Sequence, residues 1–486
     1  MNYSLRLLGL ASILVACGCS AMGGSDMSSA PAMGAPGGEF GATQGGVQDM
    51  TFARKLVEEG RIPPADAFIV EAMFSEHDLP IEGAPCAKTL CLRAAMGVAP
   101  NNAGNPAAWT QIGMSSTIDP ATYQAPSMAI VATVDVSGSM GWGYGEGQTT
   151  PASITHALLR AIAGQLREGD RFSLVSYGSS SWVNLGWTHG TDPAIAASID
   201  SLGEAGSTNM EAGMKLAYSK AAEALGTAQQ TRVLLFTDVQ PNVGATTATE
   251  FQQLAGDGAS KGVGLTVFGV GLGMGAEVMK AMSELRGGNA FSVMNPADVP
   301  SFMEDNWPWL ASPVAYGLKL QASAAPGLTL AGAYGFPGEQ STSLEVATVF
   351  LSKRRGGMLL ELAPSGPLET GSVEVSLQYS DSTGENHQET LTASYDGQAL
   401  DEQGRYLPQQ GLRRAVPLAK LVTAMHDAAT VYRTQPDTAI SVLQTALQRF
   451  ELEAAGDAEL EKEAQFWNKL LGLMKSGAPQ GDLYPH

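Results

Sequence analysis

Five oxygen-bearing side chains close to apolar runs suggest a cation site. The β-branched apolar run 128–135 ends in Asp135, and Ser137 and Ser139 follow at two-residue intervals. A buried strand in an open α/β sheet presents ligands beyond its carboxyl end, where a turn can gather these three side chains. One carboxylate and two neutral hydroxyls suit a hard cation, with Mg²⁺ expected and Ca²⁺ or Mn²⁺ as alternatives. The loop could instead only cap a helix, because Ser-rich loops are common.

Two further segments strengthen the metal interpretation. Thr208 lies in the run GSTNMEAGM, in a loop before a predicted helix, and Asp238 ends a second apolar run, LLFTD. Three separate loops at strand ends therefore present Asp, Ser, Ser, Thr and Asp in that order.

These residues and their order closely resemble the metal-ion-dependent adhesion site of the von Willebrand factor A domain, over about residues 128–310. The resemblance implies that Asp135, Ser137, Ser139 and Thr208 approach a divalent metal. It also implies that Asp238 acts on the metal directly or through water. The segment 60–74 and the order of the regions look like a family of bacterial lipoproteins that carry such a domain.

The composition of this ligand set favours binding over catalysis. Two carboxylates leave the charge of a divalent cation incompletely neutralised, and an octahedral ion keeps positions that water fills. A carboxylate from outside can neutralise the remaining charge and fill an open coordination position, so we expect a protein partner that presents Asp or Glu. An enzymatic site needs a base or an activated water beside a substrate pocket. The alternatives are a structural scaffold of an envelope assembly and, less favoured, a metal-dependent hydrolase.

Alternating strand and helix patterns predict an α/β fold with a doubly wound, mostly parallel sheet, similar to a Rossmann fold, over residues 128–310. Residues 311–405 predict an antiparallel, β-sandwich-like domain. Residues 406–486 predict a helical region. Residues 49–127 combine helices with two strands that we expect to pack on the β domain, so that the α/β domain is inserted into it.

The N-terminus has the pattern of a secreted lipoprotein. Residues 1–16 contain Arg6 and then an apolar stretch, the form of a signal peptide. The sequence Leu-Val-Ala-Cys that ends at Cys17 resembles a lipobox, in which this Cys is lipidated; the alternative is an ordinary signal peptide with a chance Cys. The Gly-, Ser- and Ala-rich range 17–48 predicts a flexible linker. We expect a bacterial envelope protein, lipid-anchored in the outer membrane and facing the periplasm or the surface.

Charge excludes several classes of function. The chain has 28 Lys and Arg against 48 Asp and Glu, a net charge of −20. Nucleic-acid binding needs clustered cations, so no nucleic-acid partner is expected. The glycine-rich loop 141–150 lacks the Gly-Lys-Ser/Thr of a phosphate-binding loop, so no nucleotide is expected either.

Two smaller features have two interpretations each. Cys86 and Cys91 can close a disulfide in an oxidising compartment, or remain free thiols. Trp142 and Tyr144 lie beside Ser139 and can form an exposed rim for a partner, or fold back and pack.

Overall fold

The apolar run 128–135 forms strand β5 (Met128–Asp135), which is buried along its whole length. The structure, a computed structural model, describes residues 40–481 except 44, 119–125, 145–148, 205, 239–247, 272–287, 311–312 and 337–340. These residues belong to one compact unit, Glu39–His486. No helix in this described part of the chain is long and apolar enough to cross a membrane.

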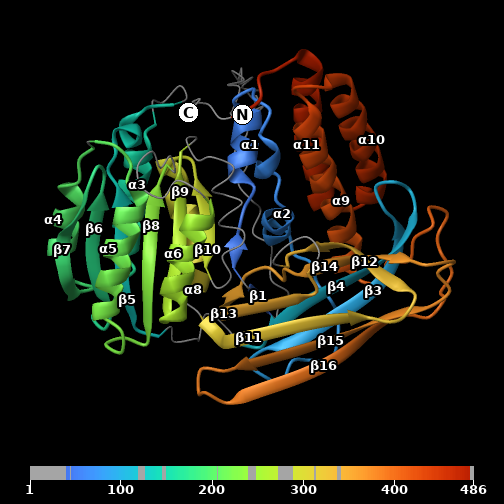
Figure 1. The fold of residues 1–486 in the computed structure, drawn as a ribbon, viewed down its shortest axis with the longest axis horizontal. Coiled ribbons are helices and arrows are strands. Elements are labelled where there is room, and N and C mark those ends of the chain that lie inside the picture. Colours follow the sequence, from blue (N-terminus) through green and yellow to red (C-terminus); the bar gives the residue numbers. More distant parts are fainter. Residues whose placement is uncertain are drawn as a thin grey trace, which may run out of the picture. The chain divides into compact units, whose positions relative to one another are not determined.

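Strand β5 lies within a seven-stranded sheet with the order β2-β10-β9-β8-β5-β6-β7 (Figure 1). All neighbours are parallel except β7, which is an antiparallel edge strand beside β6. The mostly parallel sheet predicted from the sequence is therefore confirmed. The other strands are β2 (Gly46–Val47), β6 (Arg171–Tyr177), β7 (Ser181–His189), β8 (Gln230–Thr237), β9 (Val263–Val270) and β10 (Asn289–Val293).

Helices follow the strands of this sheet in two groups. Helix α3 (Pro151–Ala163) begins where Thr150 accepts a hydrogen bond from the Ser153 backbone and Pro151 occupies the first turn. It contacts α4 and α8, whereas α5 contacts α6. The sequence pattern also predicts a helix over residues 276–285, which lie outside the described residues. The bounds are α4 (Ala194–Asp200), α5 (Met210–Glu223), α6 (Ala248–Ser260) and α8 (Val299–Leu310), with short 3-10 turns η2 (Gly138–Gly141) and η3 (Pro296–Asp298).

A second, antiparallel sheet contains nine strands, some before and some after the α/β domain. The α/β domain is therefore inserted into the chain of the β domain. Hydrogen bonds join all nine strands in one sheet, in place of the two packed sheets of the predicted sandwich. Strand β3 also contacts β15 and β16, and the strands of this sheet share one apolar core. Its strands are β1 (Phe40–Thr43), β3 (Cys91–Pro100), β4 (Pro106–Ser116), β11 (Pro313–Ala324), β12 (Leu328–Tyr334), β13 (Ser343–Ser352), β14 (Met358–Pro364), β15 (Gly371–Ser380) and β16 (Asn386–Tyr395).

The predicted linker 17–48 is wrong at its C-terminal end. Strand β1 pairs with β13 and β4 in the antiparallel sheet, and β2 pairs with β10 in the parallel sheet. Ala42 and Val47 are both buried there. Neighbouring strands bond to the backbone of this segment and bury its side chains. The composition of the segment does not indicate either contact. Residues 17–39 of the predicted linker lie outside the described residues.

The C-terminal region is helical, as predicted, and forms three consecutive helices. Helix α9 contacts α10, which contacts α11. The N-terminal helices α1 and α2 contact α11 and α9, so the helical part of segment 49–127 packs on these helices, whereas its strands enter the antiparallel sheet. The bounds are α1 (Thr51–Glu58), η1 (Ala65–Ala67), α2 (Val70–Glu76), α9 (Gln410–Val431), α10 (Pro436–Ala454) and α11 (Ala458–Ser476).

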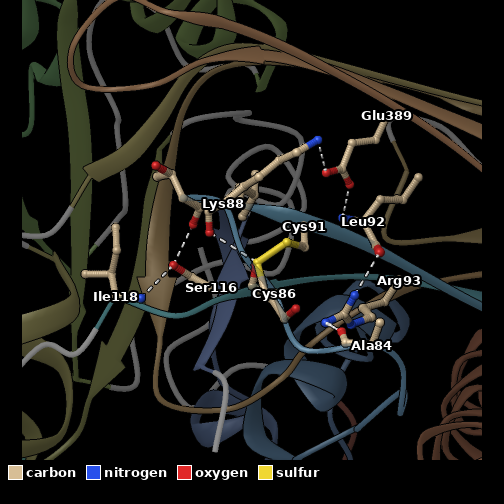
Figure 2. The surroundings of a disulfide bond; sticks show 12 residues. Ala84, Cys86, Lys88, Cys91, Leu92, Arg93, Ser116, Ile118 and Glu389 are labelled. Atoms are coloured by element: carbon tan, nitrogen blue, oxygen red, sulfur yellow. Dashed lines mark hydrogen bonds and ion pairs between the residues drawn. A yellow bond between two sulfur atoms is a disulfide. The ribbon is translucent and has the colours of Figure 1, made fainter.

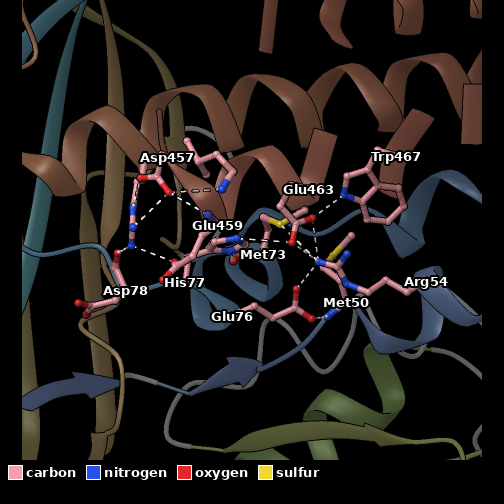
Figure 3. Close-up of polar contacts among 12 residues, drawn as sticks. Met50, Arg54, Met73, Glu76, His77, Asp78, Asp457, Glu459, Glu463 and Trp467 are labelled. Carbon is pink, nitrogen blue, oxygen red and sulfur yellow. Dashed lines mark hydrogen bonds and ion pairs between the residues drawn. The ribbon is translucent and has the colours of Figure 1, made fainter. Parts of the chain in front are cut away.

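A buried charge cluster ties the N-terminal helices to α11 (Figure 3). Arg54 Nη2 lies 2.5 Å from Glu76 Oε2 and 2.9 Å from Glu463 Oε1. The indole of Trp467 donates to Glu463 Oε2 at 2.8 Å, and His77 Nε2 lies 3.5 Å from Glu463 Oε1. Burial alone would raise the pKa of Glu463, but hydrogen bonding to His77 and the charge of Arg54 lower it to about 2. Glu463 is therefore an ionised carboxylate in the interior.

Cys86 and Cys91 form a disulfide with an S–S distance of 2.03 Å, just before and at the start of β3 (Figure 2). Within and beside this loop, Lys88 Nζ lies 2.7 Å from Glu389 Oε1, and the backbone N–H of Leu92 donates to Glu389 Oε2 at 2.8 Å. The bridge therefore lies at a contact between β3 and β16.

Candidate metal centre

Strand β5 delivers Asp135 to the edge of the sheet, and the next turn brings Ser137 and Ser139 back towards it. Oδ1 of Asp135 accepts a hydrogen bond from the backbone N–H of Ser137 at 2.9 Å. The hydroxyl oxygens of Ser137 and Ser139 lie 3.1 Å apart. Asp135 and Ser137 are each 1% exposed, and Ser139 is partly exposed. The Asp-x-Ser-x-Ser spacing therefore places one carboxylate and two hydroxyls in one compact turn.

A second loop, which contains Thr208, is attached to this turn through the backbone. The N–H of Gly138 donates to the Gly206 carbonyl at 3.0 Å. Gly206 has a φ of 88°, and a Cβ there would lie 2.6 Å from Ser179 Oγ, so glycine fits both the conformation and the space. Thr208 is 1% exposed, and Asn209 caps α5 by accepting from the Ala212 N–H at 3.0 Å. Thr208 is thus buried at a fixed point between this loop and α5.

Asp238 follows the last residue of β8, the strand next to β5, and is 2% exposed. Burial and then the charge of Asp135 raise the pKa of Asp238 to about 7, and the Ser139 hydroxyl opposes this rise. Burial likewise raises the pKa of Asp135. The two carboxylates therefore share one buried region, and each disfavours the ionisation of the other.

These residues fit a divalent cation. Asp238 Oδ1 is buried and has no hydrogen-bond partner among the described residues. Within the same part of the chain, no Lys, Arg or His forms an ion pair with Asp135 or Asp238. A buried carboxylate pair is stabilised in its ionised form by a compensating positive charge. Oxygen ligands from carboxylates and hydroxyls are those that hard cations such as Mg²⁺ take.

Sequence reasoning missed two side chains at this site, Thr237 and Tyr177. The Thr237 hydroxyl donates to Asp135 Oδ2 at 2.9 Å. Tyr177 ends β6 opposite Asp135 and is fully buried. Both residues end strands that pair with β5, so knowledge of the strand order would have placed them beside Asp135. That order could not be read from the spacing within one segment.

The structure separates the two residues of the predicted partner rim. Trp142 is 53% exposed and follows Ser139 closely, with its backbone N–H donating to the Ser139 carbonyl at 2.9 Å. Tyr144 is 5% exposed, and its hydroxyl donates to the Met294 carbonyl. For Tyr144 the rim interpretation was therefore wrong and the alternative, that its ring folds back and packs, is confirmed. Cys17, the predicted lipidation site, lies outside the described residues.

A second group of metal-ligating types occurs in the turn between β15 and β16. Asp381, Glu385 and His387 lie close enough to share one ion. However, Asp381 already accepts bonds from His387 Nε2 at 2.8 Å and from the backbone N–H groups of Thr383 and Glu385 at 2.8 and 3.1 Å. These hydrogen bonds account for the close approach of the three side chains in the turn without an ion.

Residues 130–240 match the family model of the von Willebrand factor type A domain. An uncharacterized protein of Escherichia coli (strain K12), YfbK, is 29% identical over 224 residues, which are 45% of this chain. The match spans 38% of that relative's own length.

Two solved structures match over most of this chain. A von Willebrand factor type A protein from Catenulispora acidiphila matches with a TM-score of 0.50 at 12% identity, over 80% of this chain and 91% of that chain. The ArnB paralog VWA2 from Sulfolobus acidocaldarius matches with a TM-score of 0.45 at 14% identity, over 80% of this chain and 98% of that chain.

Domains of the matched type commonly bind a divalent metal at an adhesion site and mediate contacts between proteins. The family match covers both β5 and β8, the strands that deliver Asp135 and Asp238. The chain therefore contains a von Willebrand factor type A domain.

Proposed function

We propose that this protein binds a protein partner through a divalent cation, and that an Asp or Glu of the partner completes the coordination of that cation. Asp135, Ser137, Ser139 and Thr208 hold the cation, and Asp238 acts directly or through water. The observation that carries the proposal is that Asp135 and Asp238 form a buried pair of carboxylates. The Oδ1 atom of Asp238 has no hydrogen-bond partner among the described residues.

Mg²⁺ is the cation we propose, with Ca²⁺ or Mn²⁺ as the alternatives. Mg²⁺ binds through one or two carboxylates, retains several waters and exchanges some of them for groups on a ligand. Three neutral hydroxyls and two carboxylates match this behaviour. The bound cation supplies a positive charge with positions open to an outside carboxylate, while the protein oxygens fix where that carboxylate must arrive.

The exposed ring of Trp142 supports a partner surface beside this site. Large aromatic side chains are frequent anchors of protein interfaces. Because Trp142 closes the turn that begins at Ser137, a partner that reaches the cation passes near its ring. Trp142→Ala should therefore weaken partner binding while leaving metal affinity unchanged.

The proposed role is binding and not catalysis, since the ligand set supplies no general base beyond the carboxylates that hold the cation. The proposed place of action is the bacterial envelope, with Cys17 lipidated and the A domain facing the periplasm or the surface. Partition of the protein into a detergent phase, lost in Cys17→Ser, tests the anchor independently of the metal site.

The experiment for the binding role is a pull-down from envelope extract with Mg²⁺ and with EDTA. The bait is the full chain, and the variants are Asp135→Ala and, as a matched control, Asp381→Ala. We expect a partner that is retained by wild type and Asp381→Ala in Mg²⁺ and lost with EDTA or Asp135→Ala. Equal retention under all conditions would overturn the proposal.

The scaffold alternative predicts a different pattern in the same samples. If the metal only stiffens the loops, Asp135→Ala lowers the thermal stability strongly but does not change which proteins are retained. A metal-dependent turnover that Asp135→Ala abolishes would favour the hydrolase instead.

A further inference from the structure

Tyr177 is a buried residue of the A domain beside the proposed metal ligands. It is the last residue of β6 and lies opposite Asp135 in the parallel ladder. Its carbonyl accepts the backbone N–H of Val136 at 2.8 Å. The side chain is fully buried. The ring therefore starts from the same edge of the sheet as the metal ligands.

The ring of Tyr177 is fixed from the other side by helix α5. A Cβ on Gly213 would lie 2.4 Å from Cδ1 of Tyr177, so only glycine leaves room for the ring. Gly213 lies in the first turns of the helix that follows Thr208. Tyr177 thus packs between the strand of Asp135 and the helix that begins after Thr208, which fixes the direction of its hydroxyl.

The Tyr177 hydroxyl is buried and lies near Asp135 and Thr237, but it makes no hydrogen bond of good geometry with the described residues. Burial and then the charges of Asp135 and Asp238 raise the pKa of Tyr177 well above its usual value, and the Thr237 hydroxyl opposes this rise. The group is therefore a neutral phenol close to both carboxylates. A buried donor without an acceptor is costly, and buried groups of this kind call for an explanation.

We infer that Tyr177 is a positioning residue of the metal centre, whose hydroxyl donates a hydrogen bond to the carboxylate of Asp135 when the cation is bound. Donors that bond to metal-ligating carboxylates fix their orientation, and their loss typically weakens metal binding by 10- to 100-fold. The inference rests on the proposed metal site. It adds a residue that does not itself touch the cation.

The test compares Tyr177→Phe with wild type and with Tyr218→Phe. Tyr218, on α5, is a matched control because its hydroxyl is also buried without a partner, but it lies near Arg232 at the opposite end of β8. Titration calorimetry with Mg²⁺ and with Mn²⁺ should show a Kd about 10-fold higher for Tyr177→Phe. The Kd of Tyr218→Phe should equal that of wild type.

Thermal unfolding in EDTA separates positioning from a structural role. Removing a hydroxyl that makes no hydrogen bond of good geometry with the described residues should leave the Tm of Tyr177→Phe in EDTA unchanged or raise it. A lower Tm together with an unchanged Kd would show that the hydroxyl is only structural and would overturn the inference.

A spectroscopic measurement on wild type does not depend on how the variant folds. A new hydrogen bond at a buried phenol shifts its near-ultraviolet absorption, so Mg²⁺ should produce a tyrosine difference spectrum that persists in Tyr218→Phe and is absent in Tyr177→Phe. Metal uptake by wild type without such a spectrum contradicts the inference alone. No uptake by wild type contradicts the proposed function as well.

Discussion

The Thr237 hydroxyl donates a 2.9 Å hydrogen bond to Oδ2 of Asp135. The strand that ends before Asp238 therefore holds the carboxylate that ends β5. Because Oδ1 of Asp135 accepts from the Ser137 N–H at 2.9 Å, both oxygens of this buried carboxylate are fixed by the protein. The site is thus ordered by neighbouring strands before any cation contributes.

Thr237→Val should destabilise the metal-free protein by about 1–3 kcal/mol, because Asp135 then loses a donor in the interior. Urea unfolding in EDTA measures this loss, and the Kd for Mg²⁺ should rise in the same variant. Thr237→Ser keeps the hydroxyl and serves as the control, with a smaller loss. A Thr237→Val protein as stable as wild type would show that this bond does not contribute.

Divalent metal affinity should fall as the pH decreases from 8 to 6. The pKa of Asp238 is raised to about 7, so below pH 7 the metal-free carboxyl holds a proton that binding must displace. One proton gives a slope approaching tenfold in Kd per pH unit below the pKa. Calorimetry across this range checks the slope, and Asp238→Asn should show weaker binding with the slope removed. A pH-independent Kd in wild type would contradict the assignment of Asp238.

The same raised pKa predicts how the metal-free protein responds to pH. In EDTA the folded state binds its proton more tightly than the unfolded state, so this group makes the protein less stable as the pH rises from about 4 to 7. The Asp238→Asn variant lacks this carboxyl, so its free energy of unfolding in EDTA should decline less than that of wild type between about pH 4 and 7. Denaturant unfolding at several pH values measures the difference.

Glu463→Gln should cost about 1–3 kcal/mol of stability, because Arg54 then keeps only Glu76 as a charged partner and the indole of Trp467 loses a charged acceptor. Glu459→Gln, on the same helix, is the control. The side chain of Glu459 is 43% exposed, and its pair with Arg414 should contribute about 1 kcal/mol or less. Since the pKa of Glu463 is lowered to about 2, its contribution should be complete above about pH 4.5 and lost as the pH falls towards 2. Equal losses in both variants would contradict this picture.

Removal of the disulfide in the double variant Cys86→Ser, Cys91→Ser should lower stability by about 2 kcal/mol, the value expected for a short closed loop. Hydrogen exchange should rise first at the start of β3, where Leu92 contacts Glu389. If faster exchange were spread evenly over both sheets, the bridge would not act locally.

Much of the fold could be predicted because strand and helix periods survive in the sequence. The run 128–135 is apolar at consecutive positions, which suits a strand buried on both faces, and β5 is buried throughout. Residues 40–47 gave no such signal. Residues 40–43 and 46–47 form strands because their backbones bond to the edges of β13 and β10.

The candidate metal ligands stand out in the sequence because Asp135 and Asp238 end apolar runs and Ser137 and Ser139 follow Asp135 at two-residue spacing, whereas the direction of nearby aromatic rings cannot be read from the sequence. Trp142 and Tyr144 lie in one glycine-rich segment that has no period to distinguish inside from outside. The hydroxyl of Tyr144 bonds to the carbonyl of Met294, far along the chain. Tyr177 was missed for a related reason, since its position beside Asp135 follows from strand pairing alone.

The most direct test of the central claim is titration calorimetry of the full chain with Mg²⁺ at neutral pH. We predict one divalent ion bound per chain by wild type and by Asp381→Ala, and none by Asp135→Ala in a variant that remains folded. Uptake by Asp135→Ala equal to that of wild type, or no uptake of any divalent ion by wild type, would contradict the account.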